Sequence, residues 1–183
     1  MSDPYVLPEN LPVPVDDGAA DHLTGAELPD LVLPSSQGAV NVRDFKVLYV
    51  YPRSGRPGRP LLPGWDEIPG AHGCTPQSCA FRDHYRELRA LGAAVYGLST
   101  QDTAYQREAV ERLPLPFPLL SDADLAFASA VRLPTFQVAG MSLTRRATLI
   151  VVDGRIAKVF YPVFPPDQNA AEVVAWLSRQ LHR

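Results

Sequence analysis

The two cysteines of this chain lie five positions apart, in the segment GCTPQSC at residues 73–79. An amphipathic pattern follows directly, so Cys74 is predicted to lie just before the first turn of a helix. Thr75 is expected to cap that helix, and Pro76 is tolerated where no helical N–H partner is needed. The free N–H groups and the helix dipole favour a thiolate there, so we expect Cys74 to be the nucleophile of the pair.

The spacing also limits how the two cysteines can react with each other. If the helix runs through Cys79, five residues separate the cysteines by about 7.5 Å along the axis and about 140° around it. A disulfide needs Cα atoms roughly 4.4–6.8 Å apart. We therefore expect the segment to be helical when reduced and locally unfolded when oxidised.

Two simpler readings of the cysteines stay open at this point. Cys79 could be a small buried hydrophobic residue without a reaction of its own. A zinc site would need four ligands, and only His72 and His84 lie near the two thiols in sequence.

The composition of the chain indicates what kind of protein carries these two thiols. The chain has 183 residues, 19 prolines and a net charge of −3, which predicts one domain with many stiff loops and argues against nucleic acid as a partner. No secretory signal and no apolar run long enough for a bilayer is recognisable. We expect a cytoplasmic protein with no membrane partner, in which a disulfide would be transient, catalytic or sensory.

Apolar runs alternate with helical patterns along most of the chain, which predicts an α/β domain with a central sheet, parallel pairs and helices on both faces. Residues 1–25 are expected to be an extended arm, residues 26–183 one domain, and residues 53–72 a Pro- and Gly-rich loop. The expected strands cover residues 30–42, 46–52, 93–99 and a short segment near 116–122, with a hairpin turning at Asp153–Gly154; the expected helices follow Cys79 as far as Gly92, and cover 103–113, 124–131 and 169–181.

The segments PGAHGCTPQSCAFRD and PFPLLSDADLAFASAV resemble the thiol peroxidases called peroxiredoxins, in particular their Q branch, the bacterioferritin comigratory proteins. The resemblance extends from about Leu28 to the C-terminal helix. It implies a thioredoxin-like fold with an N-terminal β-hairpin and a mixed sheet flanked by helices. It also implies reduction of hydrogen peroxide and organic hydroperoxides, a thioredoxin-like dithiol reductant, and no metal or organic cofactor.

Carried over by position, Cys74 matches the peroxidatic cysteine and Cys79 the resolving cysteine, which would form a disulfide within one monomeric chain. The run TRRATLIVVDGRI resembles the segment in which the family has an arginine two residues before a threonine, here Arg146. Its guanidinium would stabilise the charge of the departing oxygen. Arg145 is the competing candidate for this role.

The chain departs from the family pattern just before Cys74. The family has a proline seven residues and a threonine or serine three residues before its peroxidatic cysteine, where this chain has Glu67 and Ala71. Pro52 occupies the strand end where that proline belongs, so Arg53 to His72 resembles an insertion. Its apolar side chains, including Trp65, could shape an entrance that favours organic hydroperoxides.

Three substitutes for the missing hydroxyl are considered. Ser54 or Thr75 could take its place, or the site could work without it, with His72 adding charge when protonated. An exposed His72 without a role is the simpler expectation.

The leading hypothesis is therefore a monomeric two-cysteine thiol peroxidase. A thioredoxin-like disulfide exchanger is disfavoured because its cysteines would be separated by two residues, a spacing that is absent here. A redox sensor or binding module that uses the same helix-unwinding disulfide remains the alternative from a different class.

Overall fold

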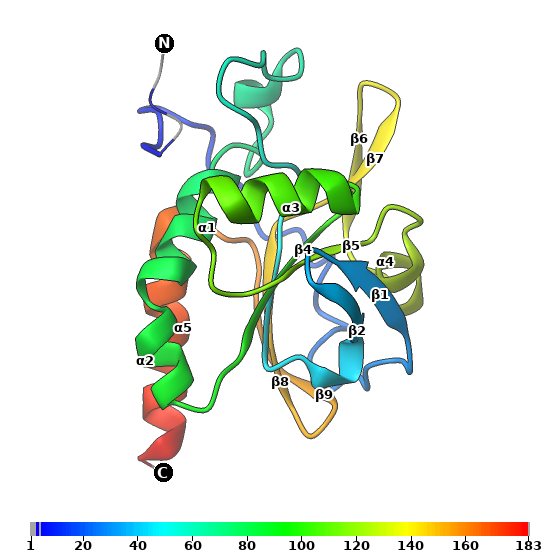
Figure 1. Cartoon of the computed structure of the whole chain (residues 1–183), viewed down its shortest axis with the longest axis vertical. Coiled ribbons are helices and arrows are strands. Elements are labelled where there is room, and N and C mark those ends of the chain that lie inside the picture. Colours follow the sequence, from blue (N-terminus) through cyan, green and yellow to red (C-terminus); the bar gives the residue numbers. More distant parts are fainter. Residues whose placement is uncertain (1–2, 4, 183) are drawn as a thin grey trace.

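A seven-stranded mixed sheet forms the centre of the structure (Figure 1). In the computed structural model, which describes residue 3 and residues 5–182, the strand order is β2-β1-β5-β4-β3-β8-β9. The pairs β3–β4 and β4–β5 are parallel, and the other neighbours are antiparallel. The strands are β1 (Val32–Ser35), β2 (Gly38–Asn41), β3 (Val47–Val50), β4 (Val95–Ser99), β5 (Leu119–Ser121), β8 (Ala147–Val152) and β9 (Arg155–Phe160).

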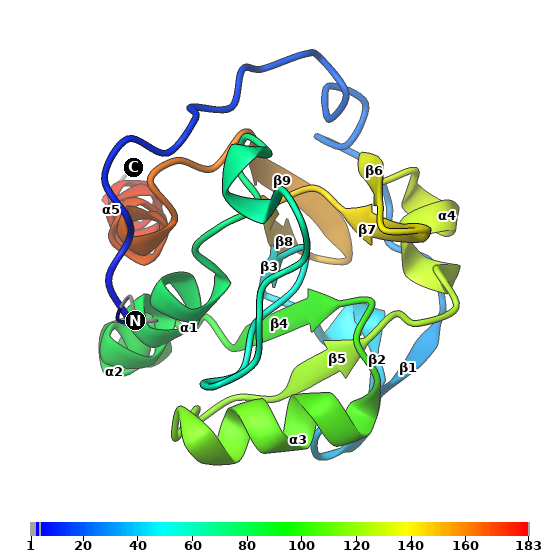
Figure 2. The ribbon, with the colours of Figure 1, turned by 90° about the horizontal axis from the view of Figure 1, so that it is seen from above.

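Helices cover both faces of this sheet, as predicted. Successive side chains of a strand point to opposite faces, so Val47 and Tyr49 of β3 pack with one group of helices while Leu48 and Val50 pack on the other side. The first face carries α1 (Cys74–Asp83), α2 (Tyr85–Ala90), α3 (Thr103–Arg112) and α5 (Asn169–Leu181), and the second carries α4 (Ala126–Val131). Figure 2 shows α1, α2 and α5 side by side along one edge of the molecule.

Local sequence signals explain where several elements begin and end. The side chain of Asp102 accepts a hydrogen bond from the backbone N–H of Tyr105 and caps α3. Gly92, with φ of +76°, follows the last turn of α2. Asp153 and Gly154 both have positive φ and join β8 to β9. These three predictions are confirmed.

Three sequence predictions need correction. The helix predicted to run to Gly92 is interrupted at His84, whose φ of −94° and ψ of 4° leave the α-helical range. Thr75 does not cap α1, because the helix starts one residue earlier and Gly73 is its N-cap. A hairpin of β6 (Thr135–Val138) and β7 (Met141–Thr144) was not predicted; β6 alternates in burial, and an Ala-Gly turn joins it to β7.

Two irregular segments, residues 5–17 and residues 53–72, reach the start of α1. Residues 5–17 form no helix or strand and pass α5 before running toward the β6–β7 hairpin (Figure 2). Further along, Leu23 is buried in the core on the α4 side. Residues 53–72 contain a short 3-10 turn, η2 (Trp65–Glu67), and Trp65 packs with Phe136 of β6.

The remaining 3-10 turns are η1 (Val42–Asp44) and η3 (Pro166–Gln168), the second of which leads directly into α5. Met1, Ser2 and Pro4 of the predicted arm, and Arg183 at the end of the predicted domain, lie outside the described residues. No helix in the described part of the chain has the length and apolarity that a membrane span requires.

Gly97 of β4 leaves the space in which Tyr49 packs, and Tyr49 in turn supports α1. A Cβ at Gly97 would lie 2.5 Å from Cδ2 of Leu119 and 2.7 Å from Cζ of Tyr49. The Tyr49 ring stacks on Phe81 of α1 with 4.6 Å between ring centroids. The glycine therefore allows the close approach between the sheet and the helix that carries both cysteines.

We expect Gly97→Ala to lower the free energy of unfolding by about 1–3 kcal/mol, because the methyl group must displace two packed side chains. Urea denaturation measures this. Gly55→Ala is the matched control, since a Cβ there meets only Cδ2 of Leu61 at 3.7 Å. Equal unfolding free energies for the two variants would contradict this account of the packing.

Candidate active site

Cys74 is the first residue of α1, and the conformation of Gly73 sets its position. Gly73 has φ of +111°, and a Cβ on it would lie 2.5 Å from Cγ of Pro166 and 2.8 Å from Cδ2 of Leu7. Any other residue would be strained in its backbone and would meet these two side chains. The turn before Cys74 is thus enclosed by the N-terminal segment on one side and by η3 on another.

The guanidinium of Arg146 lies against the sulfur of Cys74. Its Nη2 donates to Cys74 Sγ at 3.2 Å and to the carbonyl of Ala71 at 3.0 Å. Its Nε donates to the carbonyl of Gly70 at 3.3 Å. Both side chains are nearly inaccessible, with 4% of Arg146 and 3% of Cys74 exposed. The two residues that the sequence singled out are therefore brought into direct contact.

No carboxylate among the described residues forms an ion pair with Arg146. Its charge is met by carbonyl oxygens of residues 70–72, by the side-chain oxygen of Gln77 and by the sulfur. A buried cation is costly unless it is compensated. Among these partners of Arg146, the sulfur of Cys74 is the atom that can carry a full negative charge.

A chain of buried amides and hydroxyls fixes the Arg146 side chain from behind. Gln77 of α1 accepts from Arg146 Nη1 and donates through Nε2 to Oδ1 of Asn169 at 3.2 Å. Thr148 of β8 donates to the same Oδ1 at 2.6 Å. Gln77, Asn169 and Thr148 are all fully buried. The sequence reasoning missed Gln77 and Asn169; the signal available was a polar residue on the inward side of each helix.

Cys79 lies about 1.4 turns further along α1 and is also a free thiol. Five residues of helix separate it from Cys74, so the two Cα atoms are about 7.5 Å apart along the axis. The sulfurs cannot bond while α1 is intact. Burial raises the pKa of the Cys79 thiol above its ordinary value of 9.0. Cys79 is thus a neutral thiol in the folded helix at neutral pH.

A cavity of about 220 Å³ opens next to Cys74, and Thr75 also lines it. Ser54 does not line it; its hydroxyl donates to Oε1 of Gln101, and it faces a neighbouring cavity. The side chain of Ala71 is buried against Trp65 and Leu143 and provides no hydroxyl. Of the two hydroxyls considered as substitutes, only that of Thr75 belongs to a residue on the cavity beside the sulfur.

The other two candidates from the sequence have different surroundings. Nδ1 of His72 pairs with Oδ1 of Asp66, and only 15% of the His72 side chain is exposed. The guanidinium of Arg145 lies over the ring of Phe136, 5.3 Å from its centroid. No hydrogen bond joins Arg145 to Cys74 in the described structure. Of the two adjacent arginines, Arg146 is the one that reaches the sulfur.

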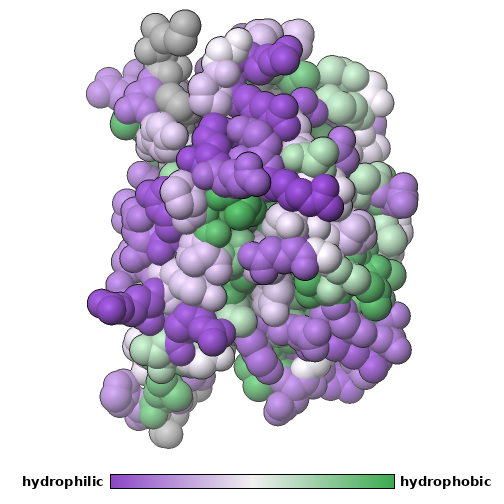
Figure 3. Space-filling view, in the orientation of Figure 1, coloured by the Kyte–Doolittle hydropathy of each residue, from purple (hydrophilic) through white to green (hydrophobic). Residues whose placement is uncertain are grey.

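The surface on the side drawn in Figure 1 is mainly hydrophilic, with a small apolar patch near its middle, below α3 (Figure 3).

Comparisons with known proteins agree with this architecture. The sequence pattern of the redoxin family matches residues 23–175. A putative chloroplastic peroxiredoxin Q of Oryza sativa subsp. indica is 30% identical over 155 residues, which are 82% of this chain and 64% of that protein. Peroxiredoxin bcp1 of Schizosaccharomyces pombe is 30% identical over 129 residues, 64% of this chain and 58% of that protein. The chain thus spans less than two thirds of the length of these relatives.

Among solved structures, peroxidoxin BcpB from Mycobacterium tuberculosis aligns with a TM-score of 0.69 and 26% identity over 85% of this chain and 96% of that one. The thioredoxin-like α/β fold predicted from the sequence is confirmed. Because the redoxin pattern matches most of its length, the chain belongs to the redoxin family, and it is similar to peroxiredoxin Q and bacterioferritin comigratory proteins.

Proposed function

We propose that this chain is a thiol peroxidase that reduces hydrogen peroxide and organic hydroperoxides, with Cys74 as the attacking residue. The observation that carries the proposal is the 3.2 Å contact between Arg146 Nη2 and Cys74 Sγ at the start of α1. A helix N-terminus and a buried guanidinium both favour negative charge at the same sulfur. The peroxiredoxin Q relatives support the same chemistry.

In the first step, the thiolate of Cys74 attacks one peroxide oxygen and the O–O bond breaks. The sulfur is oxidised to a sulfenic acid, and the second oxygen leaves with the electron pair of that bond as hydroxide or alkoxide. This oxygen takes up a proton and departs as water or an alcohol. Arg146 stabilises the charge that develops on it, and the neighbouring N–H groups of α1 assist.

In the second step, the sulfur of Cys79 attacks the sulfur of the sulfenic acid, and water leaves. The product is a Cys74–Cys79 disulfide within one chain, and its formation requires the first turns of α1 to unwind. A dithiol donor such as thioredoxin then returns both residues to thiols. We infer that the protein does this work as a monomer in the cytoplasm, without a metal or an organic cofactor.

The cysteine variants test the assignment of the two steps. Cys74→Ser should abolish peroxide-dependent consumption of reductant, because the nucleophile is lost. Cys79→Ser should still react once with peroxide but become rapidly overoxidised to the sulfinic acid, which mass spectrometry detects. A fully active Cys74→Ser protein would sink the proposal. Wild type that is oxidised once and recycles slowly would favour a redox sensor instead.

The two adjacent arginines form a matched pair for testing the role of Arg146. Arg146→Lys should slow oxidation of Cys74 by about a hundredfold to a thousandfold, because lysine cannot hold the sulfur and the turn carbonyls together. Arg145→Lys, which changes a residue stacked on Phe136, should leave the rate close to that of the wild type. Stopped-flow measurement of the first oxidation gives both rates. Equal losses in the two variants would contradict the assigned role.

The raised pKa of Cys79 predicts how the second step depends on pH. Below that pKa the buried neutral thiol favours the intact helix, and this contribution is lost as pH rises through the raised pKa. Once α1 unwinds, the Cys79 thiol regains its ordinary pKa, and below that pKa its thiolate becomes about tenfold more abundant per pH unit. Disulfide formation after a single oxidation should therefore accelerate from about pH 7 to pH 9. Quenched-flow trapping of free thiols measures it; a flat profile would contradict the prediction.

A further inference from the structure

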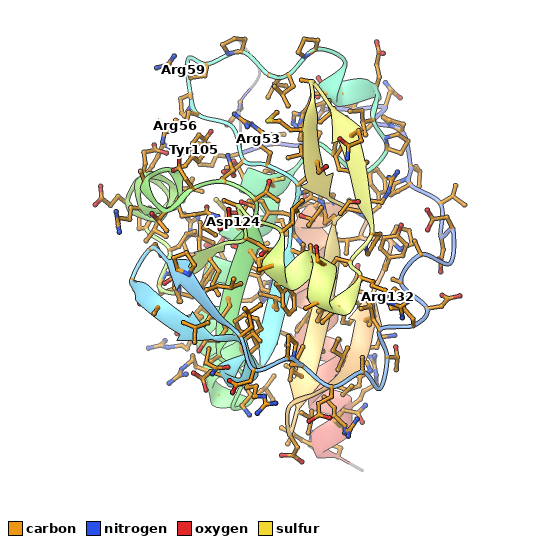
Figure 4. The ribbon with its side chains drawn as sticks, turned by 90° about the vertical axis from the view of Figure 1, so that its right-hand side faces the viewer. Arg53, Arg56, Arg59, Tyr105, Asp124 and Arg132 are labelled. Carbon is orange, nitrogen blue, oxygen red and sulfur yellow. The ribbon has the colours of Figure 1, made fainter. Side chains whose placement is uncertain are left out.

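The cavity beside Cys74 is lined by three arginines that come from one short stretch, Arg53, Arg56 and Arg59. Figure 4 shows them together with Tyr105 at one end of the molecule, beside the β6–β7 hairpin. They belong to the segment 53–72 that we propose to be an insertion. The peroxidase step described above uses none of them, so this cluster needs a separate explanation.

Arg56 is held in place by contacts on two sides. Its guanidinium lies over the Tyr105 ring, 4.0 Å from the centroid, and its Nε is 3.1 Å from Oε2 of Glu108. The same carboxylate also receives a hydrogen bond from Arg112 at 2.7 Å, which is the main reason that the pKa of Glu108 is lowered. One carboxylate therefore faces two guanidinium groups, and positive charge remains in excess.

Arg53 and Arg59 add to that excess. Nη1 of Arg53 approaches Sδ of Met141 at 3.8 Å, and the guanidinium lies 5.9 Å from the centroid of the Tyr105 ring. Neither arginine forms an ion pair with a carboxylate in the described part of the chain. Among the described residues, the one acidic residue that lines the cavity is Asp3, whose carboxylate accepts from the backbone N–H of Tyr5.

Apolar side chains complete the walls of the cavity. Leu61 is 46% exposed and lines it together with Trp65 and the ring of Pro57. The cavity is thus lined by the cysteine, by the three arginines and by apolar side chains. A ligand that matches it has a reactive peroxide, a short apolar body and an anionic group.

We propose that the arginine cluster makes this enzyme selective for organic hydroperoxides that carry a carboxylate. Arg53 and Arg59 bind the carboxylate, for which a guanidinium provides paired N–H donors, while the hydroperoxide reaches Cys74. The reaction is the one given above: the thiolate takes one oxygen, the alkoxide is protonated to the alcohol, and the carboxylate stays unchanged. This inference rests on the proposed peroxidase function.

An acidic surface on a protein reductant is the competing occupant for these arginines. The geometry favours the small anion, because the three arginines and Cys74 line the same cavity. A measurement that omits the reductant separates the two occupants.

The test compares cumene hydroperoxide with its para-carboxylate analogue in single-turnover oxidation of Cys74, followed by stopped flow without reductant. Wild type should react about tenfold faster with the carboxylate at low salt, and high salt should reduce this preference. Arg53→Gln and Arg59→Gln should each lower the rate ratio of the two peroxides by about fivefold. Arg132→Gln, at a distance from the cluster in Figure 4, should keep the wild-type ratio. Thermal unfolding confirms that each variant is folded.

The outcomes separate this inference from the function on which it rests. Failure of every peroxide to oxidise folded wild type would overturn both. Oxidation by both peroxides, with equal ratios in wild type and the two arginine variants, would overturn the selectivity and leave the peroxidase standing. Unchanged oxidation ratios together with a higher KM for an acidic protein reductant would assign the arginines to the reductant and so overturn the proposal.

Discussion

The charge of a buried arginine is the constraint on which the site depends. Arg146 has no acidic partner among the described residues, so backbone carbonyls must turn toward it from the loop that precedes α1. That loop can do so only because Gly73 adopts a left-handed conformation before the helix begins. The same turn brings the sulfur of Cys74 to the guanidinium. One unpaired cation thereby organises the loop, the helix start and the position of the thiol.

The network behind Arg146 links this charge to the stability of α1. Gln77 connects Arg146, which directly precedes β8, to Asn169 at the start of α5, so unwinding α1 past its first turn removes a hydrogen bond from each. Buried polar groups are costly when their partners leave. Unwinding α1 therefore costs the free energy of these buried hydrogen bonds.

Local signals in the sequence predicted much of this structure, whereas contacts between distant segments escaped it. Asp102, Gly92 and the Asp153–Gly154 turn act within a few residues, so their effects could be read directly. The link from Gln77 to Asn169 depends on how α1 and α5 dock, and no local pattern encodes that. The β6–β7 hairpin escaped because its strands are short and its turn, Ala139–Gly140, is less distinctive than Asn-Gly or Asp-Gly. Cys74 and Arg146 were identified by motif, but only the fold shows their contact.

The enclosure of Gly73 by Leu7 and Pro166 bears on how the protein is made. These three residues are far apart in the sequence, so their contact can form only after residue 166 has been synthesised. A chain still emerging from the ribosome can build the parallel strands but cannot yet close the turn at Cys74. The turn that carries Cys74 therefore acquires these surroundings only after η3 has been synthesised.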